Sequence, residues 1–226
     1  MIAYPALLFV AALVLTGSIA RALGISAPAA IVIAALAYPA SALFVPGRID
    51  HHGLQLVLLL ALTRALFGRG SWQKGAAAGL VSAVSVAIGM EMVPLLAAGG
   101  AVLAIRWIVD DADERARLAG YGLLLSAGLA AAALFLRTNG WSYPACDGFA
   151  APSWRAAQLG ALAPLALVLI APGLKGIGLR LAAAGAIGVL ALIAMLVVSP
   201  ACLHPYGEVD PVLAQIWLAN VAEAEP

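Results

Sequence analysis

The sequence predicts an all-α, polytopic membrane protein, a transmembrane helical bundle of about eight spans. The first observation is composition: 64% of the 226 residues are hydrophobic, only 10% are charged, and the mean hydropathy is +1.04. Soluble domains carry about 25% charged residues, so this chain has too few charges to cover a soluble surface of its size. The second observation is a series of long apolar runs separated by short polar stretches.

The apolar runs set the expected helices. A spanning helix needs about 20 apolar residues to cross a hydrocarbon core of roughly 30 Å. The third and fourth runs look short for a full crossing. We expect helices at residues 2–20, 27–45, 52–67, 75–89, 92–109, 118–136, 154–171 and 180–198, which together form a transmembrane domain over residues 1–198.

Residues 75–109 are expected to break into two helices. As one helix they would measure roughly 52 Å, far more than the hydrocarbon core. Gly89, Glu91 and Pro94 supply a break near the middle.

The distribution of basic residues supports the same break. With eight spans, nine of the 12 lysines and arginines fall on one side, whereas a single span over 75–109 would divide them six and six. Cytoplasmic loops are enriched in basic residues, so we expect the nine to be cytoplasmic. They are Arg21, Arg64, Arg69, Lys74, Arg106, Arg115, Arg117, Lys175 and Arg180.

This topology puts the loop 46–53, the loop 137–153 and the tail from residue 199 outside. Met1 also starts outside, with no basic signal region before the first apolar run. We therefore expect a further span upstream of it. The tail 199–226 offers Asp210 as N-cap and Pro211 as first helical residue, which predicts a short interfacial helix with an apolar face of Val212, Leu213, Ile216, Trp217 and Val221.

Small residues and cysteines give two further expectations. The stretches "AAAGLVSAVSVAIG" (76–89) and "LAAAGAIG" (181–188) favour close helix packing. Cys146 and Cys202, the two cysteines, both lie in loops expected to be outside. Disulfides persist in that compartment, so the sequence favours a Cys146–Cys202 bridge.

The stretch "PGRIDHHGLQLVLLL" places titratable side chains at the mouth of an apolar run, where charged groups are costly. Asp50 and His52 form an Asp-x-His pair that can chelate a divalent cation. Gly47 and Gly53 would let the backbone fold tightly around such a site. Alternatively, Asp50 caps the helix that begins near His51. The two roles are compatible, and both remain open.

Two other acidic segments have contrasting interpretations. Glu91, in "AIGMEMVP", lies between two apolar spans on the same side as Asp50, so the two carboxylates could share a cavity or Glu91 could be an ordinary turn residue. The run "VDDADERARL" (109–118) resembles a magnesium-binding acidic run. It falls on the opposite side, however, and we interpret it as a solvated start of the next helix, neutralised by neighbouring arginines.

At "GRIDHHGLQ" the chain resembles the second acidic motif of oligosaccharyltransferase catalytic subunits, whose archaeal members carry an Asp-x-His in an outer loop. More closely, "RIDHHGLQLVLLLAL", "SVAIGMEMVP", "CDGFAAPSW" and "HPYGEVDPVLAQIWLANVAEA" resemble a bacterial group of GT-C-type membrane glycosyltransferases. The resemblance implies an inner-membrane protein that transfers a sugar from a polyprenyl-phosphate-linked donor on the periplasmic side. It also implies that Asp50 and His52 hold a divalent metal ion, Mg²⁺ or Mn²⁺, against the phosphate.

Neighbouring residues, given by their position in the chain, and a partner complete the predicted site. We assign Arg48 and His51 to substrate binding and Glu91 as the candidate catalytic carboxylate. In the oligosaccharyltransferases a first helix and an acidic loop with the catalytic aspartate precede this motif. The chain begins at what matches the second helix, so we expect an upstream segment or a membrane protein partner to supply the acidic motif.

Three functions therefore remain as hypotheses. The first is a glycosyltransferase, or a part of one, which acts on a lipid-linked sugar. The second is a non-catalytic membrane assembly subunit. The third is a transporter, which would want titratable groups at mid-span, where the sequence has almost none. Neither the net charge of +1 nor any motif points to nucleic acid, and no phosphate-binding glycine loop or nucleophile with its base is present.

Overall fold

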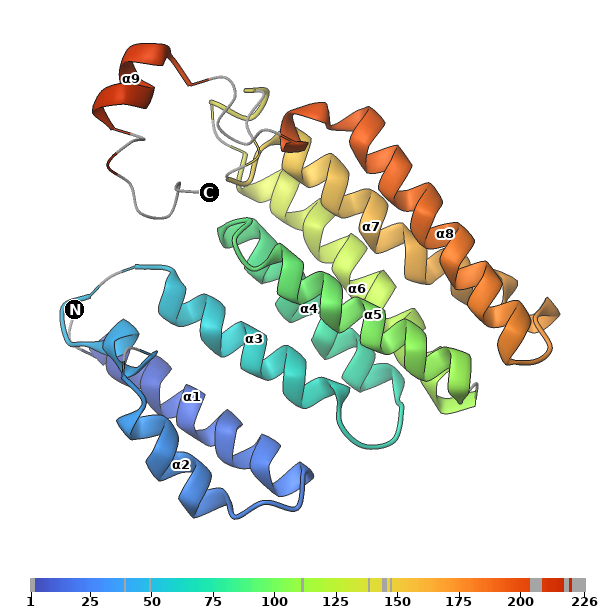
Figure 1. The fold of residues 1–226 in the computed structure, drawn as a ribbon, viewed down its shortest axis with the longest axis horizontal. Coiled ribbons are helices and arrows are strands. Elements are labelled where there is room, and N and C mark those ends of the chain that lie inside the picture. The colour runs from blue at the N-terminus through green and yellow to red at the C-terminus, as the bar shows by residue number, and fades with distance from the viewer. Residues whose placement is uncertain are drawn as a thin grey trace.

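A computed structural model of the chain is an all-α helical bundle (Figure 1). The structure describes residues 3–38, 40–48, 50–110, 112–137, 139–143, 146, 148–203, 209–217 and 220. These residues contain no strand, so the all-α fold class is confirmed. Among them, four helices are long and apolar enough to cross a membrane, in the segments Ala3–Ala22, Asp113–Phe135, Ala151–Gly173 and Ile177–Val198. The structure is thus compatible with an integral membrane protein.

Each of the eight predicted ranges overlaps one α-helix. The helices are α1 (Ala3–Ala22), α2 (Ala27–Leu36), α3 (His52–Leu66), α4 (Trp72–Ile88), α5 (Val93–Val109), α6 (Ala112–Phe135), α7 (Ala151–Ile170), α8 (Ile177–Val198) and the short α9 (Pro211–Ile216) of the tail. Three 3₁₀ segments connect them: η1 (Ala40–Phe44), η2 (Ala171–Gly173) and η3 (Pro200–Leu203).

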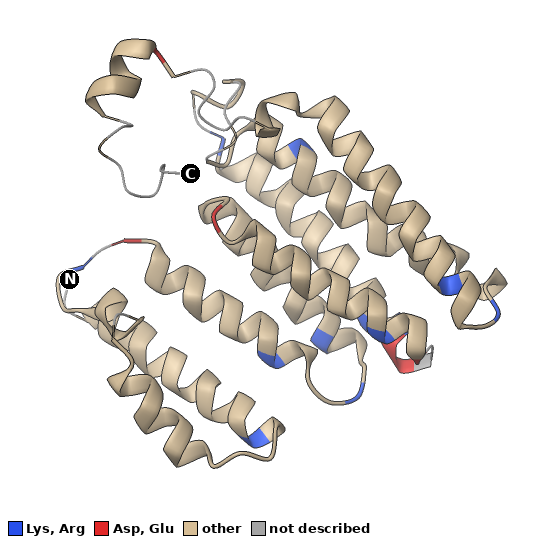
Figure 2. Ribbon diagram, in the orientation of Figure 1, with Lys and Arg blue, Asp and Glu red and all other residues tan. Residues whose placement is uncertain are grey.

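Successive helices from α1 to α8 run in alternating directions, so their ends gather in two groups (Figure 1). Arg21, Arg64 and Arg106 occupy the last turns of α1, α3 and α5. Figure 2 shows most lysines and arginines at this one end of the bundle, which we call the basic end. We call the other end, where α3 and α5 begin, the site end.

The predicted break within residues 75–109 is confirmed. Helix α4 ends at Ile88, α5 begins at Val93, and the N–H of Val93 donates to the carbonyl of Met90 in the turn between them (3.0 Å). Pro94 lies in the first turn of α5, where its missing N–H has no helical partner to lose.

Two predicted boundaries are wrong. The run 27–45 is not one helix, because α2 ends at Leu36 and a separate 3₁₀ turn follows. The sequence has a proline at position 39, which disfavours helical geometry at Tyr38. Helix α6 begins at Ala112 rather than 118, with Asp113 and Glu114 in its first turn, where carboxylates interact favourably with the helix dipole.

Helices α4 and α6 approach each other closely through glycines. Gly75 and Gly79 form a Gly-x-x-x-Gly pair on α4, and a Cβ at either position would collide with the α6 backbone, at the carbonyl of Arg117 or Tyr121. Gly120 of α6 faces α4 in the same way, with a Cβ site 2.8 Å from the nitrogen of Ala76. The expected packing role of small residues at 76–89 is therefore seen here.

The corresponding expectation holds only in part for 181–188, because Ala183 and Ala184 pack against the core but the glycines of this stretch do not. A Cβ at Gly185 or Gly188 would meet nothing within 4 Å among the described residues. Helix α8 has no buried residue, and Val189, Leu190 and Val197 are all more than half exposed. The exposed surface of α8 is thus apolar, and such a surface is suited to contact with lipid.

A buried ionic cluster holds the basic end together. Glu114 and Arg117 are 2% and 0% exposed, so the solvated interpretation of this segment is wrong for both. Glu114 accepts a hydrogen bond from Arg106 (2.7 Å), while Arg117 donates to the carbonyls of Leu66 (2.8 Å) and Gly68 (2.7 Å). The cluster satisfies carbonyls at the end of α3 and fixes the α3–α4 loop. Asp111 of the same run lies outside the described residues.

The tail is linked to the bundle by a disulfide. Cys146 and Cys202 are bonded, with their Cα atoms 4.9 Å apart and a sequence separation of 56. In α9, the Asp210 side chain accepts a hydrogen bond from the N–H of Val212 (2.8 Å), as expected of an N-cap. Val212, Leu213, Ile216 and Trp217 are exposed, and Val221 lies outside the described residues.

We predict that Gly75→Ala destabilises the protein and Gly185→Ala does not. The added methyl at 75 collides with α6 backbone, which cannot move without disturbing the Arg117 cluster. Overpacking of this kind costs about 1–3 kcal/mol. Thermal unfolding in detergent measures the difference. Equal melting temperatures for the two variants would contradict the α4–α6 packing.

We also predict that the native protein has no free thiol. A thiol-reactive maleimide should label the protein only after reduction, and Cys202→Ser should expose Cys146 to labelling. Loss of a bridge that closes a loop of this length costs about 2–4 kcal/mol, so reduction should also lower the melting temperature. Full labelling without a reductant would contradict the bridge.

Candidate functional site

The candidate site is built from two segments at the site end: the residues that lead into α3 and the turn between α4 and α5. Residues 50–52 precede or open α3, and Glu91 lies in the α4–α5 turn about 40 residues later. The apolar helices place these polar groups where each helix starts or ends, since charges inside the apolar layer are costly.

Asp50 fixes the start of α3. Its carboxylate forms an ion pair with Arg48 and accepts a hydrogen bond from the N–H of His52 (3.2 Å). The N-cap of α3 is His51, which makes no side-chain capping bond, so Asp50 is not the N-cap; it lies one residue earlier and accepts the first N–H of the helix. The other group of the predicted metal-binding pair is close, with His52 Nδ1 3.7 Å from Asp50 Oδ1. Gly47 has φ +89°, a left-handed conformation that favours glycine.

The structure brings Glu91 to the histidines. Its Oε1 lies 3.1 Å from His51 Nε2, and the rings of His51 and His52 stack with centroids 4.3 Å apart. His51, His52 and Glu91 can each present one ligand atom so that all three atoms lie within 4.8 Å of one another. The loop 46–53 and Glu91 therefore share one site, as the sequence suggested.

Gln55 is a site residue that the sequence interpretation missed. It lies one turn into α3, is fully buried, and its Nε2 donates to Glu91 Oε2 (2.9 Å). Gly89 makes room for this contact, because a Cβ there would stand 2.6 Å from Glu91 Oε2 and 3.3 Å from Gln55 Nε2. The available signal was an amide inside the apolar run "GLQLVLLL", since polar residues in such runs are uncommon.

Both site carboxylates favour the ionised form. Partial burial acts to raise the pKa of Glu91, but the hydrogen bonds from Gln55 and His51 outweigh it and hold that pKa below its usual value. Burial likewise acts to raise the pKa of Asp50, and the adjacent Arg48 guanidinium holds that pKa below its usual value. The site end therefore offers two anionic carboxylates beside two imidazoles, a set of donors suited to a cation.

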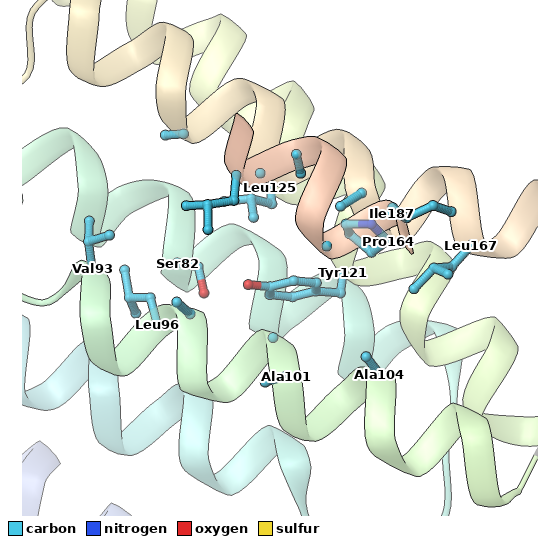
Figure 3. Close-up of a pocket in the computed structure, with 18 of the residues that line it drawn as sticks. Ser82, Val93, Leu96, Ala101, Ala104, Tyr121, Leu125, Pro164, Leu167 and Ile187 are labelled. Atoms are coloured by element: carbon cyan, nitrogen blue, oxygen red, sulfur yellow. The ribbon is translucent and has the colours of Figure 1, made fainter. Parts of the chain in front are cut away.

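An apolar cavity of about 600 Å³ lies between α4, α5, α6, α7 and α8. Its lining runs from Met90 and Val93, next to Glu91 in the chain, to Ile108 near the other end of α5. Figure 3 shows the Tyr121 hydroxyl directed toward Ser82 among Leu96, Leu125 and Leu167, so polar groups are few along its wall. The cavity suits a hydrocarbon chain.

No family model matches the chain, and comparison with curated proteins and with solved structures finds no match either. Functional interpretation therefore depends on the site itself.

We predict that Asp50→Ala lowers the stability of the protein by about 1 kcal/mol, the usual worth of a hydrogen bond, because the N–H of His52 and the Arg48 guanidinium both lose their partner. Asp50→Asn should cost less, because an asparagine oxygen can also accept the N–H of His52. Thermal unfolding of the two variants measures this. Identical stability for Asp50→Ala and the wild type would show that the carboxylate does not stabilise the start of α3.

Proposed function

We propose that the chain is an integral membrane glycosyltransferase, or the membrane part of one, that transfers a sugar from a polyprenyl-phosphate-linked donor at the outer face. The observation that carries the proposal is the gathering of Asp50, His51, His52 and Glu91 at the end of the bundle opposite the basic end. The resemblance of "GRIDHHGLQ" to the Asp-x-His motif of oligosaccharyltransferases supports it.

In this proposal all eight helices cross the inner membrane of a bacterium, with the basic end in the cytoplasm and the site end in the periplasm. The excess of basic residues at one end supports this orientation. Helix α2 has 10 residues and measures about 15 Å, and helices α3, α4 and α5 have 15–17 residues and measure about 23–26 Å, all short of the roughly 30 Å core. Short spans are accommodated by local thinning of the bilayer.

The site residues have distinct roles in the proposal. Asp50 and His52 bind a divalent cation, which when bound neutralises charge on the leaving phosphate. Arg48 exchanges its ion pair with Asp50 for a charge-assisted contact to the phosphate. His51 helps to bind the substrate, and Glu91 is the carboxylate available to accept a proton, with its orientation set by Gln55.

The cavity supports a lipid-linked substrate. Its walls are apolar, it borders the α4–α5 turn through Met90, and its lining extends over roughly 22 Å of α5 at 1.5 Å per residue. A polyprenyl chain in this cavity would place its phosphate toward the site end. A membrane protein partner with an outer acidic loop would complete the catalytic centre, as the resemblance implies.

We predict that Asp50→Asn and His52→Ala each abolish sugar transfer in native membranes. The assay supplies a panel of radiolabelled polyprenyl-phosphate hexoses and follows loss of label from the lipid. Native membranes retain any partner. Asp50→Asn keeps an oxygen that can accept the N–H of His52, so a loss of transfer reports the charge and not the fold.

Asp210→Asn is the matched control, because it removes another carboxylate while asparagine still caps α9. It should transfer as the wild type does. Transfer at wild-type rates in both Asp50→Asn and His52→Ala membranes would overturn the proposed function.

A further inference from the structure

A pair of hydroxyl groups interrupts the apolar wall of the cavity. Ser82 of α4 and Tyr121 of α6 both line it and are only 1% and 5% exposed. The Tyr121 hydroxyl is directed toward Ser82 (Figure 3), yet Ser82 Oγ has no hydrogen-bond partner of normal geometry within the described part of the chain. Two hydroxyls carry two O–H donors, and a bond between them would use only one. At least one donor at the cavity wall is therefore left without an acceptor, which is costly in apolar surroundings.

The pair lies near the middle of the length of the bundle. Ser82 is ten residues after Trp72 and six before Ile88, the first and last residues of α4, and thus about 15 Å and 9 Å from the ends of this helix. In the proposed orientation this depth is within the hydrocarbon core, away from the lipid headgroups at its two edges. An acceptor that a lipid presents to the pair must consequently belong to its hydrocarbon chain.

A polyprenyl chain has such an acceptor and a saturated chain does not. Each isoprene unit contains a carbon–carbon double bond, whose π electrons accept a weak hydrogen bond. Because the double bonds recur along the whole chain, one of them comes opposite the pair wherever the phosphate is held. A saturated chain presents only C–H groups at this depth, so it would leave the hydroxyl donor unpaired.

Glycine and alanine around the pair leave room for such a chain. A Cβ at Gly100 of α5 would stand 3.3 Å from the Tyr121 hydroxyl oxygen, so a larger residue there would cover that hydroxyl. The lining elsewhere is also rich in small residues, which leave space for the methyl branch of each isoprene unit. They include Ala97, Ala101, Gly160, Ala184 and Gly188.

We propose that Ser82 and Tyr121 determine the specificity of the cavity, by selecting an isoprenoid chain over a saturated chain of equal length. The hydroxyl pair donates to a double bond of the bound chain at mid-membrane depth. The inference deepens the proposed function and rests on it for the identity of the lipid as the sugar donor, but selection of the chain is a property of binding and requires no transfer activity.

Competition binding to the purified full chain in detergent tests the inference. Radiolabelled polyprenyl phosphate is bound first and is then displaced either by the same unlabelled lipid or by its fully hydrogenated analogue. The wild type should prefer the unsaturated competitor about two- to fivefold, as expected for one weak hydrogen bond to a π-system. In the double variant Ser82→Ala, Tyr121→Phe this ratio should fall to about one. Its affinity for the hydrogenated analogue should equal or exceed that of the wild type, because no hydroxyl is then left unpaired against the chain.

Tyr4→Phe is the matched control, because it removes a tyrosine hydroxyl from α1, outside the cavity lining. It should keep the wild-type ratio. The ratio compares two lipids on the same variant, so a general loss of affinity lowers both values and does not imitate a loss of selection. Thermal unfolding checks that the double variant is folded, and the single variants Ser82→Ala and Tyr121→Phe replace it if it is not.

The outcomes separate the two proposals. Equal affinity of the wild type for both lipids, or a wild-type ratio in the double variant, would overturn selection by Ser82 and Tyr121 while leaving the proposed function standing. A preference that is lost in the double variant and kept in Tyr4→Phe supports the selection even if native membranes carrying Asp50→Asn and His52→Ala transfer sugar normally, a result that overturns only the proposed function.

Discussion

The apolar composition of this chain confines its polar groups to the two ends of the helical bundle. Only 10% of the residues are charged, and a charged side chain costs several kcal/mol within hydrocarbon. Both ends consequently become polar clusters, one rich in arginine and lysine and one with two carboxylates beside two histidines (Figure 2). The site residues are neighbours because the same constraint acts on every helix end.

The basic end and the α4–α6 contact form the framework that supports the site. Arg117 binds carbonyls at the end of α3 and lies on α6, which in turn packs against α4 through Gly75 and Gly79. Arg117 is also paired with the buried Glu114, and breaking a buried ion pair is strongly destabilising. Arg117 therefore stays in place, and its hydrogen bonds to Leu66 and Gly68 hold the α3–α4 loop. At the other end of the same helices, this framework sets the distance between the start of α3 and the α4–α5 turn, and so between His51 and Glu91.

Much of the fold could be predicted from the sequence because it depends on local signals. Hydrophobic runs, the break around Glu91 and the cap of Asp210 all follow from a few adjacent residues. The extent of α2 was overestimated since hydropathy does not register the effect of a proline on the preceding residue. The burial of Glu114 and Arg117 was not predictable from local sequence, because it depends on which carbonyls of the α3–α4 loop come within reach.

The candidate site, too, could be predicted from the sequence only where it depends on local signals. The sequence singled out Asp50, His51, His52 and Glu91 as titratable groups beside apolar runs, and it placed them on one side. It did not identify Gln55, whose importance depends on the non-local contact with Glu91. Nor did it decide whether Asp50 caps a helix or binds an ion, since the same residue type at the same position serves both. The contact between His51 and Glu91, 40 residues apart, depends on the packing of α3 against the α4–α5 turn, which the sequence alone does not give.

The most direct test of the account is the side of the membrane on which each end of the bundle lies. Val45 and Arg69 are 51% exposed and highly exposed, near the site end and the basic end respectively. In intact spheroplasts, a membrane-impermeant maleimide should label Val45→Cys, and Arg69→Cys should react only after permeabilisation. Labelling of Arg69→Cys from outside with Val45→Cys protected, or labelling of both from one side, would contradict the proposed orientation and with it an outer-face site.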